Sequence, residues 1–199
     1  DGPSAGVTMA SAFSLLRVGF VGAMVLCIFL IVGIDVGVNA VSGQFLLAQF
    51  DSIQTVAESG RSLYFFGKMI GTFLGTLLLV RLPGRQFLTW SGLLGLASVI
   101  AFLIVPAESA ALVMIFLIGL GVANIFPLVF SLTVEAYPER ANEISGLMMM
   151  AICGGAVIPP IMGWIGDTAG ITWSFGVLIA SFALILLISL SYKIKLKTK

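Results

Sequence analysis

Six long apolar stretches, joined by short polar connections, fill almost the whole of this 199-residue chain. Each stretch is close to the roughly 20 apolar residues that a helix needs to cross a bilayer. The chain is 59% hydrophobic and 10% charged. A soluble bundle would need charged outer faces on its helices, and residues 86–105 contain no charged side chain. The sequence therefore predicts an all-α membrane protein. The expected transmembrane helices lie near 16–42, 62–80, 86–105, 109–134, 143–165 and 171–192.

Basic residues gather on one side of the predicted membrane, where there are eight of them. They are Arg17, Arg81, Arg85, Arg140, Lys193, Lys195, Lys197 and Lys199. The opposite loops contain a single cation, Arg61. Under the positive-inside rule this asymmetry places both termini in the cytoplasm. Because the basic residues follow topology, the net charge of +1 gives no reason to expect nucleic acid as a partner.

The two ends of the chain differ from the spans between them. Residues 1–15 predict a connector or the end of an interdomain linker, and residues 193–199 predict a basic cytoplasmic tail. Because the chain begins with Asp1 rather than methionine, we expect a piece of a longer protein.

Little in the sequence favours enzyme chemistry. There is no histidine, and Cys27 and Cys153 fall inside predicted spans, where they suit helix packing better than a disulfide. Intramembrane hydrolysis would need a Ser/His pair, paired aspartates or a metal cluster. We therefore expect neither an enzyme nor a cofactor or metal site. A channel is disfavoured because no charged ring or filter-like loop is visible.

The six spans divide into two triplets, 16–105 and 109–192. A triplet has an odd number of crossings, so the second must enter the membrane from the opposite side to the first. Inverted repeats of this kind are a common construction of secondary transporters, with sites near mid-membrane.

Several glycines and prolines interrupt the predicted helices. Gly67, Gly71 and Gly75 form one stripe at four-residue spacing, which suits close helix packing. Proline removes a backbone donor, and membrane helices tolerate this where neighbours or a cavity satisfy the freed carbonyl. The candidate positions for helix bends or gating are Gly71, Pro127, Gly154, Gly155, Pro159 and Pro160.

Four polar residues inside the spans are the candidate substrate-binding residues. They are Asp35, Asn39, Lys68 and Asn124. A carboxylate within a span costs roughly 2.5–3.5 kcal/mol on insertion scales, so Asp35 should face protein or water. Asp35 and Lys68 lie at a similar depth, about 10 Å below one surface at 1.5 Å per residue. They predict an ion pair that either borders a cavity or only fixes helix register. Asn124 suits either a neutral polar ligand or an interhelical hydrogen bond.

Four segments resemble one known family. GIDVGVN (33–39), YFFGKMIGTFLG (64–75), ANIFPLVFSL (123–132) and NEISGLMMMAICGGAVIPPIMGW (142–164) look like the second half of major facilitator superfamily sugar transporters, the fucose/glucose/galactose:proton symporter group in particular. Arg81 stands where the superfamily's basic loop motif has an aspartate in its full form.

The resemblance implies half of a twelve-helix fold, spans seven to twelve, in a bacterial cytoplasmic membrane. It implies secondary active transport of a hexose or fucose-like sugar by alternating access, coupled to protons. The implied partners are the sugar, a proton, membrane lipid and an N-terminal six-helix half. Another small substrate in the same fold, a non-functional truncated half and a homodimer that rebuilds the twelve-helix cavity are the open alternatives.

Overall fold

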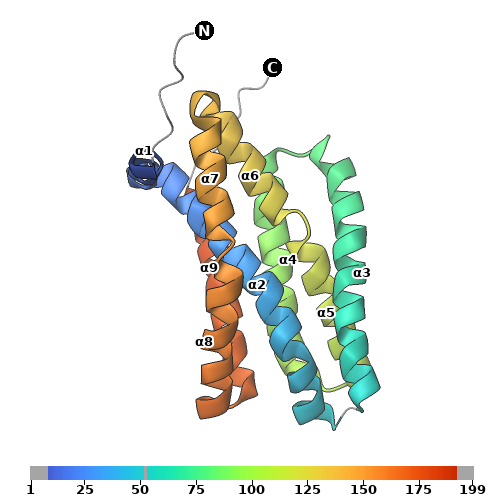
Figure 1. The fold of residues 1–199 in the computed structure, drawn as a ribbon. Coiled ribbons are helices and arrows are strands. Elements are labelled where there is room, and N and C mark those ends of the chain that lie inside the picture. Colours follow the sequence, from blue (N-terminus) through green and yellow to red (C-terminus); the bar gives the residue numbers. More distant parts are fainter. Residues whose placement is uncertain (1–8, 52, 192–199) are drawn as a thin grey trace.

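A computed structural model describes residues 9–51 and 53–191, which form a bundle of long helices (Figure 1). Residues 1–8 of the expected connector and the expected tail at 193–199 lie outside the described residues. The helical elements are α1 (Met9–Ser14), η1 (Leu15–Arg17), α2 (Gly19–Phe50), α3 (Gln54–Leu79), α4 (Gly84–Ile104), α5 (Glu108–Val122), α6 (Ile125–Ala136), η2 (Pro138–Arg140), α7 (Ala141–Ala151), α8 (Gly154–Ala169) and α9 (Ile171–Ser191).

The expected six crossings are confirmed. Six helical units of the described chain are long and apolar enough to span a membrane: α2, α3, α4, α5 with α6, η2 with α7 and α8, and α9. The first triplet begins at the end of the bundle that holds Arg17, and the second begins at the opposite end (Figure 1). We call these the basic end and the distal end. The inverted arrangement expected from counting is therefore present.

The first two crossings are longer at the distal end than the apolar pattern indicated. α2 continues to Phe50 and α3 already begins at Gln54. Ser42, Gln44 and Glu58 lowered the local hydropathy in this region, but none of them breaks a helix. Only residues 51–53 connect the two helices. Asp51, in the left-handed conformation at φ 50°, ends α2.

Apolar side chains cover the outside of the bundle as well as its core. Phe73, Leu77 and Leu187 are all more than half exposed, which is the expected surface for helices whose solvent is lipid. Trp90 lies toward the basic end, and Trp164 and Trp173 lie near the distal end. All three indoles are exposed, in agreement with aromatic belts at the two interfaces.

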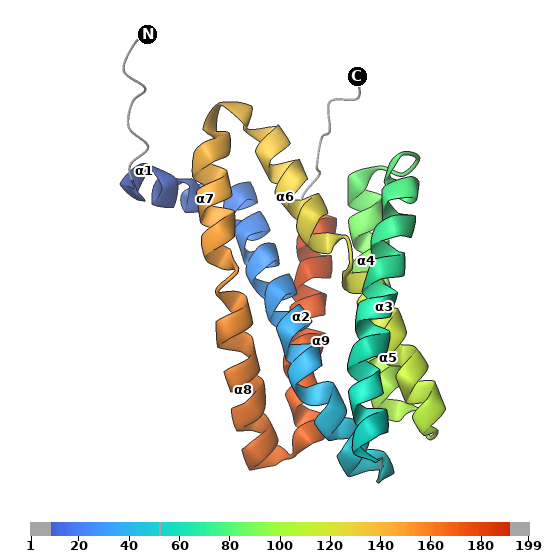
Figure 2. The same ribbon diagram turned by 45° about the vertical axis from the view of Figure 1, so that its right-hand side comes forward.

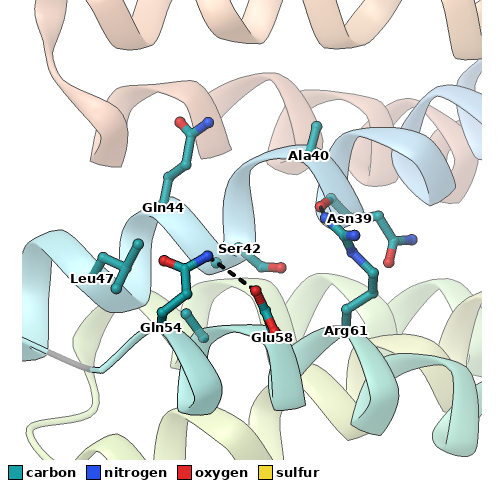
Figure 3. Close-up of a pocket in the computed structure, with 10 residues that line it drawn as sticks. Asn39, Ala40, Ser42, Gln44, Leu47, Gln54, Glu58 and Arg61 are labelled. Atoms are coloured by element: carbon teal, nitrogen blue, oxygen red, sulfur yellow. Dashed lines mark hydrogen bonds between the residues drawn. The ribbon is translucent and has the colours of Figure 1, made fainter.

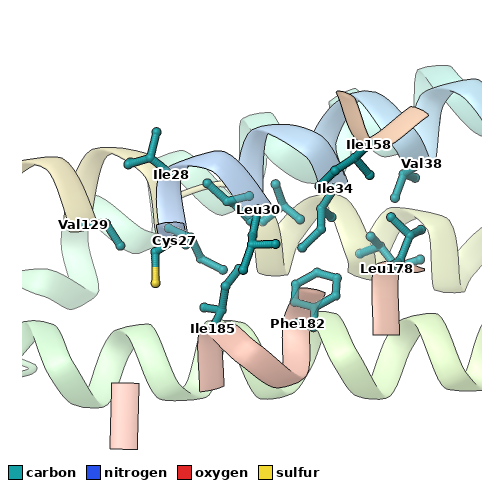
Figure 4. Close-up of a cluster of buried hydrophobic side chains, with 14 of the residues drawn as sticks. Cys27, Ile28, Leu30, Ile34, Val38, Val129, Ile158, Leu178, Phe182 and Ile185 are labelled. Carbon is teal, nitrogen blue, oxygen red and sulfur yellow. The ribbon is translucent and has the colours of Figure 1, made fainter. Parts of the chain in front are cut away.

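The core is centred on α2, which contacts α9, α8, α3 and α6. Leu30 and Ile34 of α2 point toward Phe182 and Ile185 of α9 (Figure 4). Nearer the distal end, the rings of Phe45, Phe102 and Phe175 join α2, α4 and α9, with centroids 4.7–5.3 Å apart. The Phe45–Phe175 pair is edge-on and the other two pairs are tilted, and aromatic pairs prefer such geometries to face-to-face stacking.

Glycine allows α3 and α5 to approach closely. A Cβ on Gly67 would lie 2.1 Å from the carbonyl oxygen of Phe116, and one on Gly119 would lie 2.1 Å from that of Tyr64. Gly71 belongs to the same contact, since its Cβ would meet the Leu120 carbonyl oxygen at 2.7 Å. Gly71 therefore serves the close packing that small residues provide between membrane helices.

Two crossings are interrupted near mid-length (Figure 2). The first interruption, at Ala123 and Asn124, separates α5 from α6. Pro127 explains it, because proline has no N–H to donate to the carbonyl of Ala123 four residues earlier. The break lies one turn before the proline that was the candidate bend.

The second interruption lies at Ile152 and Cys153, between α7 and α8. The amides of Ile152 and Cys153 donate to carbonyls three residues earlier, those of Met149 and Met150. Gly154 follows immediately, and a Cβ there would lie 1.9 Å from the carbonyl oxygen of Phe29 on α2.

The remaining bend candidates of this crossing lie beyond the break. A Cβ on Gly155 would lie 3.0 Å from the Val36 side chain, so this glycine also faces α2. Pro159 and Pro160 are inside the continuous helix α8. The structure therefore places the interruption before all three residues.

Gly154→Ala should destabilise the bundle, because the new methyl group would overlap the backbone of α2. Overpacking of this kind costs about 1–3 kcal/mol. Gly163→Ala is the matched control on the same helix, since a Cβ at Gly163 meets nothing within 4 Å. Thermal unfolding in detergent should show a loss for the first variant alone, and equal unfolding temperatures would contradict the close contact.

Candidate functional site

Asp35 of α2 and Lys68 of α3 form the expected ion pair. The Nζ of Lys68 donates to Asp35 Oδ1 at 2.8 Å and to Oδ2 at 2.7 Å. Each side chain is 30% exposed, so the pair is neither buried in the core nor fully on the surface. The two helices that carry it come from one triplet and meet along their distal halves (Figure 2). The prediction of pairing at similar depth is confirmed.

Tyr64 is a third member of this cluster, and the sequence analysis did not single it out. Its hydroxyl donates to Asp35 Oδ1 at 2.5 Å, and the whole residue is buried. Tyr64 lies one turn before Lys68 on α3, so both side chains reach the same carboxylate. A buried tyrosine hydroxyl usually has a hydrogen-bond partner. The spacing of four residues between Tyr64 and Lys68 was the sequence feature that could have predicted their shared contact with Asp35.

The ion pair borders a cavity of about 190 Å³, which we call the central cavity. Apart from the pair, its walls are apolar and come from α2 and from the region where α5 gives way to α6. The lining residues are Ile31, Val32, Asp35, Lys68, Val122, Ala123, Phe126 and Pro127. The charged groups and the proline break therefore meet at one hollow. The alternative prediction was an ion pair that only fixes helix register. That role does not explain why Asp35 and Lys68 line a cavity.

An aromatic surface continues from the central cavity along α6. The rings of Phe126 and Phe130 are stacked, with centroids 6.3 Å apart and planes at 21°. Phe126 itself lines the cavity. The cavity thus combines a carboxylate and an ammonium group with an apolar ring, which suits a ligand that has both hydroxyl groups and C–H faces.

Asn124 lies outside the central cavity. It is 5% exposed, and its Nδ2 donates to the carbonyl oxygen of Gly71 at 2.6 Å. Gly75 leaves room for this amide, since a Cβ there would lie 2.1 Å from Asn124 Nδ2. The contact is the interhelical hydrogen bond that was the alternative to ligand binding. A role in substrate binding stays a prediction that this geometry does not favour.

Asn39 lies one turn from Asp35, toward the distal end. Its Nδ2 donates to the Asp35 carbonyl oxygen at 2.7 Å. Its own carbonyl oxygen accepts a long hydrogen bond of 3.4 Å from Arg61 Nη2. The side-chain Oδ1 is buried without a partner among the residues described. Asn39 therefore contacts Asp35 through the backbone carbonyl oxygen of Asp35 and not through its carboxylate. The side-chain oxygen of Asn39 has no hydrogen-bond donor within the described residues.

A second hollow, the distal cavity, lies between the ends of α2 and α3 (Figure 3). Its volume is about 170 Å³. Gln54 Nε2 donates to Glu58 Oε1 at 3.2 Å across its wall, and Arg61 extends beside Asn39. The lining residues are Asn39, Ala40, Ser42, Gly43, Gln44, Leu47, Gln54, Ala57, Glu58 and Arg61.

Charged groups at the basic end stabilise helix termini. Arg85, at the start of α4, donates to the carbonyl oxygens of Ser189 and Leu190 at 2.9 and 2.7 Å. These carbonyls belong to the last turn of α9, which has no intrahelical donors for them. Arg140 pairs with Glu143 in the first turn of α7 at 2.5 Å. Both contacts stabilise helix ends, and neither Arg85 nor Arg140 lines the central or the distal cavity.

No group of three or more His, Cys, Asp or Glu side chains in residues 9–51 and 53–191 is arranged to hold a metal ion. The cluster of Asp35, Lys68 and Tyr64 supplies one carboxylate only.

The sequence matches the profile of the Major Facilitator Superfamily over residues 24–198. A Brucella abortus protein named "Glucose/galactose transporter" is 29% identical over 168 residues, 79% of this chain and 39% of its own length. A Helicobacter pylori relative is 29% identical over 172 residues, 82% of this chain and 41% of its own length. The chain therefore spans about 40% of the length of these curated relatives.

Solved structures share the fold. The E. coli fucose:proton symporter FucP superposes with a TM-score of 0.80 at 21% identity, over 92% of this chain and 45% of that one. A peptide transporter POT gives a TM-score of 0.76 at 22% identity, over 86% of this chain and 37% of that one. At these identities the likeness shows the fold alone, and in both cases about half or less of the larger protein is covered.

Asp35→Asn and Lys68→Gln should each destabilise the bundle, and the double variant should lose less stability than the sum of the two single losses. Either single change leaves one unpaired charge, and the double variant leaves none. We expect each single loss to be about 1–3 kcal/mol, below the 3–5 kcal/mol typical of fully buried pairs. Thermal unfolding of all four proteins measures the coupling, and strictly additive losses would contradict an energetically important pair.

Proposed function

Since the chain belongs to the major facilitator superfamily, as its motifs led us to expect, we propose that it is the sugar-binding half of a secondary active transporter. The proposed substrate is a neutral hexose or fucose-like sugar. Support comes from the name of the Brucella abortus relative, a glucose/galactose transporter, and from that of the structural neighbour, a fucose:proton symporter.

The observation that carries this proposal is the ion pair of Asp35 and Lys68 at the central cavity. A charge within a membrane span is expensive unless it is paired or meets water. Here the two charges neutralise one another and still open onto a hollow. Sugar hydroxyls can donate to the carboxylate and accept from the ammonium group, and hydrogen bonds to charged partners are the stronger ones.

Phe126 gives the proposed site its second recognition element. The C–H face of a sugar ring is apolar and can lie against an aromatic ring, while the hydroxyls at its edge reach the ion pair. Tyr64 is proposed as a positioning residue, because its hydrogen bond fixes Asp35 Oδ1 on the side of α3.

Alternating access is part of the same proposal. The interruptions at Ala123–Asn124 and at Ile152–Cys153 divide two crossings into half-helices. Hinges are short segments that absorb changes in backbone angles, and these two lie at the depth of the central cavity or near it. Movement of α6 relative to α5 would change the opening beside Phe126 and Pro127.

Proton coupling is proposed with Asp35 as the candidate carrier. When its carboxylate binds a proton, the charge attraction to Lys68 is lost and the pair is free to separate. Uptake measured as a function of pH tests this assignment, because Asp35→Asn should lose the pH dependence if Asp35 carries the proton and should keep it if another group of the full-length protein does.

The proposed function also includes a membrane and a partner domain. We propose a bacterial cytoplasmic membrane, with the basic end of the bundle in the cytoplasm under the positive-inside rule. The relatives are about two and a half times as long as the matched segment. We therefore propose that a second, non-identical six-helix half closes the opposite side of the central cavity.

A different small substrate is the alternative. The fold also occurs in a peptide transporter, and the fold by itself does not determine the substrate. The neutral balance of Asp35 and Lys68 favours an uncharged ligand such as a sugar over an ion.

Counterflow of radiolabelled glucose, galactose, fucose and a dipeptide into proteoliposomes tests the proposal with the full-length protein. Sugars should exchange and the dipeptide should not. Asp35→Asn should lower sugar exchange about 10- to 100-fold, the size expected for a lost charged hydrogen bond.

Asp51→Asn is the matched control. Asp51 is exposed in the short loop after α2, and asparagine tolerates its positive φ. This variant should exchange sugar at the original rate. Exchange of the dipeptide alone would overturn the proposed function, and normal sugar exchange by Asp35→Asn would overturn the assignment of Asp35 to the sugar site. Loss of the pH dependence of uptake in Asp35→Asn, with exchange retained, would assign the proton to Asp35 and the sugar to other residues.

A further inference from the structure

We infer that the distal cavity is a second, weaker subsite for the same neutral, hydroxyl-rich solute, which occupies it before reaching Asp35 and Lys68. This inference rests on the proposed function. The cavity is formed by the polar ends of α2 and α3. Six of its ten lining residues carry hydrogen-bonding side chains: Asn39, Ser42, Gln44, Gln54, Glu58 and Arg61.

An unsatisfied acceptor lies in this wall. Asn39 Oδ1 is buried and has no hydrogen-bond partner in the described chain. Buried polar groups are normally paired, so a movement of the Asn39 side chain that exposes Oδ1 to the cavity would let a donor of the solute satisfy it. The other amide atom, Nδ2, is already held by the Asp35 carbonyl oxygen.

Arg61 supplies donors to the same space. Its guanidinium has five N–H groups, and within residues 9–51 and 53–191 it makes one hydrogen bond, the 3.4 Å contact to the Asn39 carbonyl oxygen. Figure 3 shows the side chain extending beside Asn39 rather than toward Glu58. Most of its donors are thus available to a solute.

The position of Arg61 also calls for a local explanation. Of the six Lys and Arg residues in the part of the chain that the structure describes, Arg17, Arg81, Arg85 and Arg140 lie at the basic end and Lys68 lies within a membrane-spanning helix. Arg61 is the remaining one, at the end where the positive-inside rule expects few cations. A role in the distal cavity gives a reason for a guanidinium there.

The lining fits a neutral solute better than an ion. Glu58 and Arg61 contribute opposite charges, and Asn39, Ser42, Gln44 and Gln54 contribute neutral donors and acceptors. A polyhydroxylated solute both donates and accepts, so it matches this mixture. The cavity has no aromatic lining residue, in contrast to Phe126 at the central cavity. We therefore expect weak binding with little discrimination between sugars.

The two cavities lie along the same pair of helices, α2 and α3. Asn39 is four residues from Asp35 on α2, about 6 Å along the helix axis, and Arg61 is seven residues from Lys68 on α3, about 10 Å. The hydrogen bond from Asn39 Nδ2 to the Asp35 carbonyl oxygen, within α2, links a lining residue of one cavity to a lining residue of the other. The two sites are therefore separated by about one helical turn along α2 and about two along α3.

Equilibrium binding of radiolabelled D-galactose to the full-length protein in nanodiscs tests this inference. The original protein should show two classes of sites, one tight and one weak. A double variant, Glu58→Gln with Arg61→Gln, keeps the net charge and should weaken the second class about 2- to 12-fold for each hydrogen bond lost. The tight class should be unchanged.

Thr55→Ala with Ser62→Ala is the matched control. Both residues are exposed on α3 and neither lines the distal cavity, so both classes should persist. Asp35→Asn should remove the tight class and leave the weak one. In uptake, the Glu58 and Arg61 double variant should raise KM while the maximal rate is retained.

The outcomes separate this inference from the proposed function. A single tight class in the original protein, unaffected by the double variant, would overturn the distal subsite and leave the central sugar site standing. A weak class whose dissociation constant is the same in the double variant as in the original protein would overturn it as well. Absence of any saturable galactose binding, together with failed sugar exchange, would overturn the proposed function and this inference with it.

Discussion

The ion pair between Asp35 and Lys68 is the interaction on which the rest of this structure depends. Two charges within membrane-spanning helices would each cost roughly 2.5–3.5 kcal/mol on insertion scales if they met lipid alone. They are tolerable here because Lys68 donates to both carboxylate oxygens, Tyr64 donates to one of them, and the remaining exposure faces a cavity. The pair thereby joins α2 to α3 and places polar groups where a solute can reach them.

Close backbone packing positions the other wall of that cavity. α3 can approach α5 because Gly67 and Gly119 carry no side chain at their contacts. This approach brings the end of α5 and the beginning of α6 beside Lys68. Pro127 then interrupts the helix at Ala123 and Asn124, so that Phe126 faces the hollow while Asn124 turns to the Gly71 carbonyl oxygen. The packing and the proposed chemistry thus rely on the same few small or ring-constrained residues.

Much of this arrangement was predictable from the sequence, because lipid imposes strict requirements on length and polarity. The six crossings, the family and the pairing of Asp35 with Lys68 were expected and are confirmed. Depth follows from counting residues along a helix, whereas the direction in which a side chain points depends on its neighbours. For this reason the sequence left Asn124 between a ligand contact and an interhelical hydrogen bond, and Tyr64 and the distal cavity were not anticipated. The polar ends of α2 and α3 lowered the hydropathy without ending either helix.

The central claim is that water and solute reach the ion pair through the central cavity, and thiol labelling tests it most directly. Val32→Cys would place a thiol in the cavity wall, and Leu187→Cys would place one on the apolar outer surface of α9, each in a protein whose Cys27 and Cys153 are replaced by alanine. A charged, membrane-impermeant thiol reagent should modify the first and spare the second, and galactose should slow the reaction. If the thiol at position 32 is as unreactive as the one at position 187, the hollow beside Asp35 is closed to solvent and the account fails.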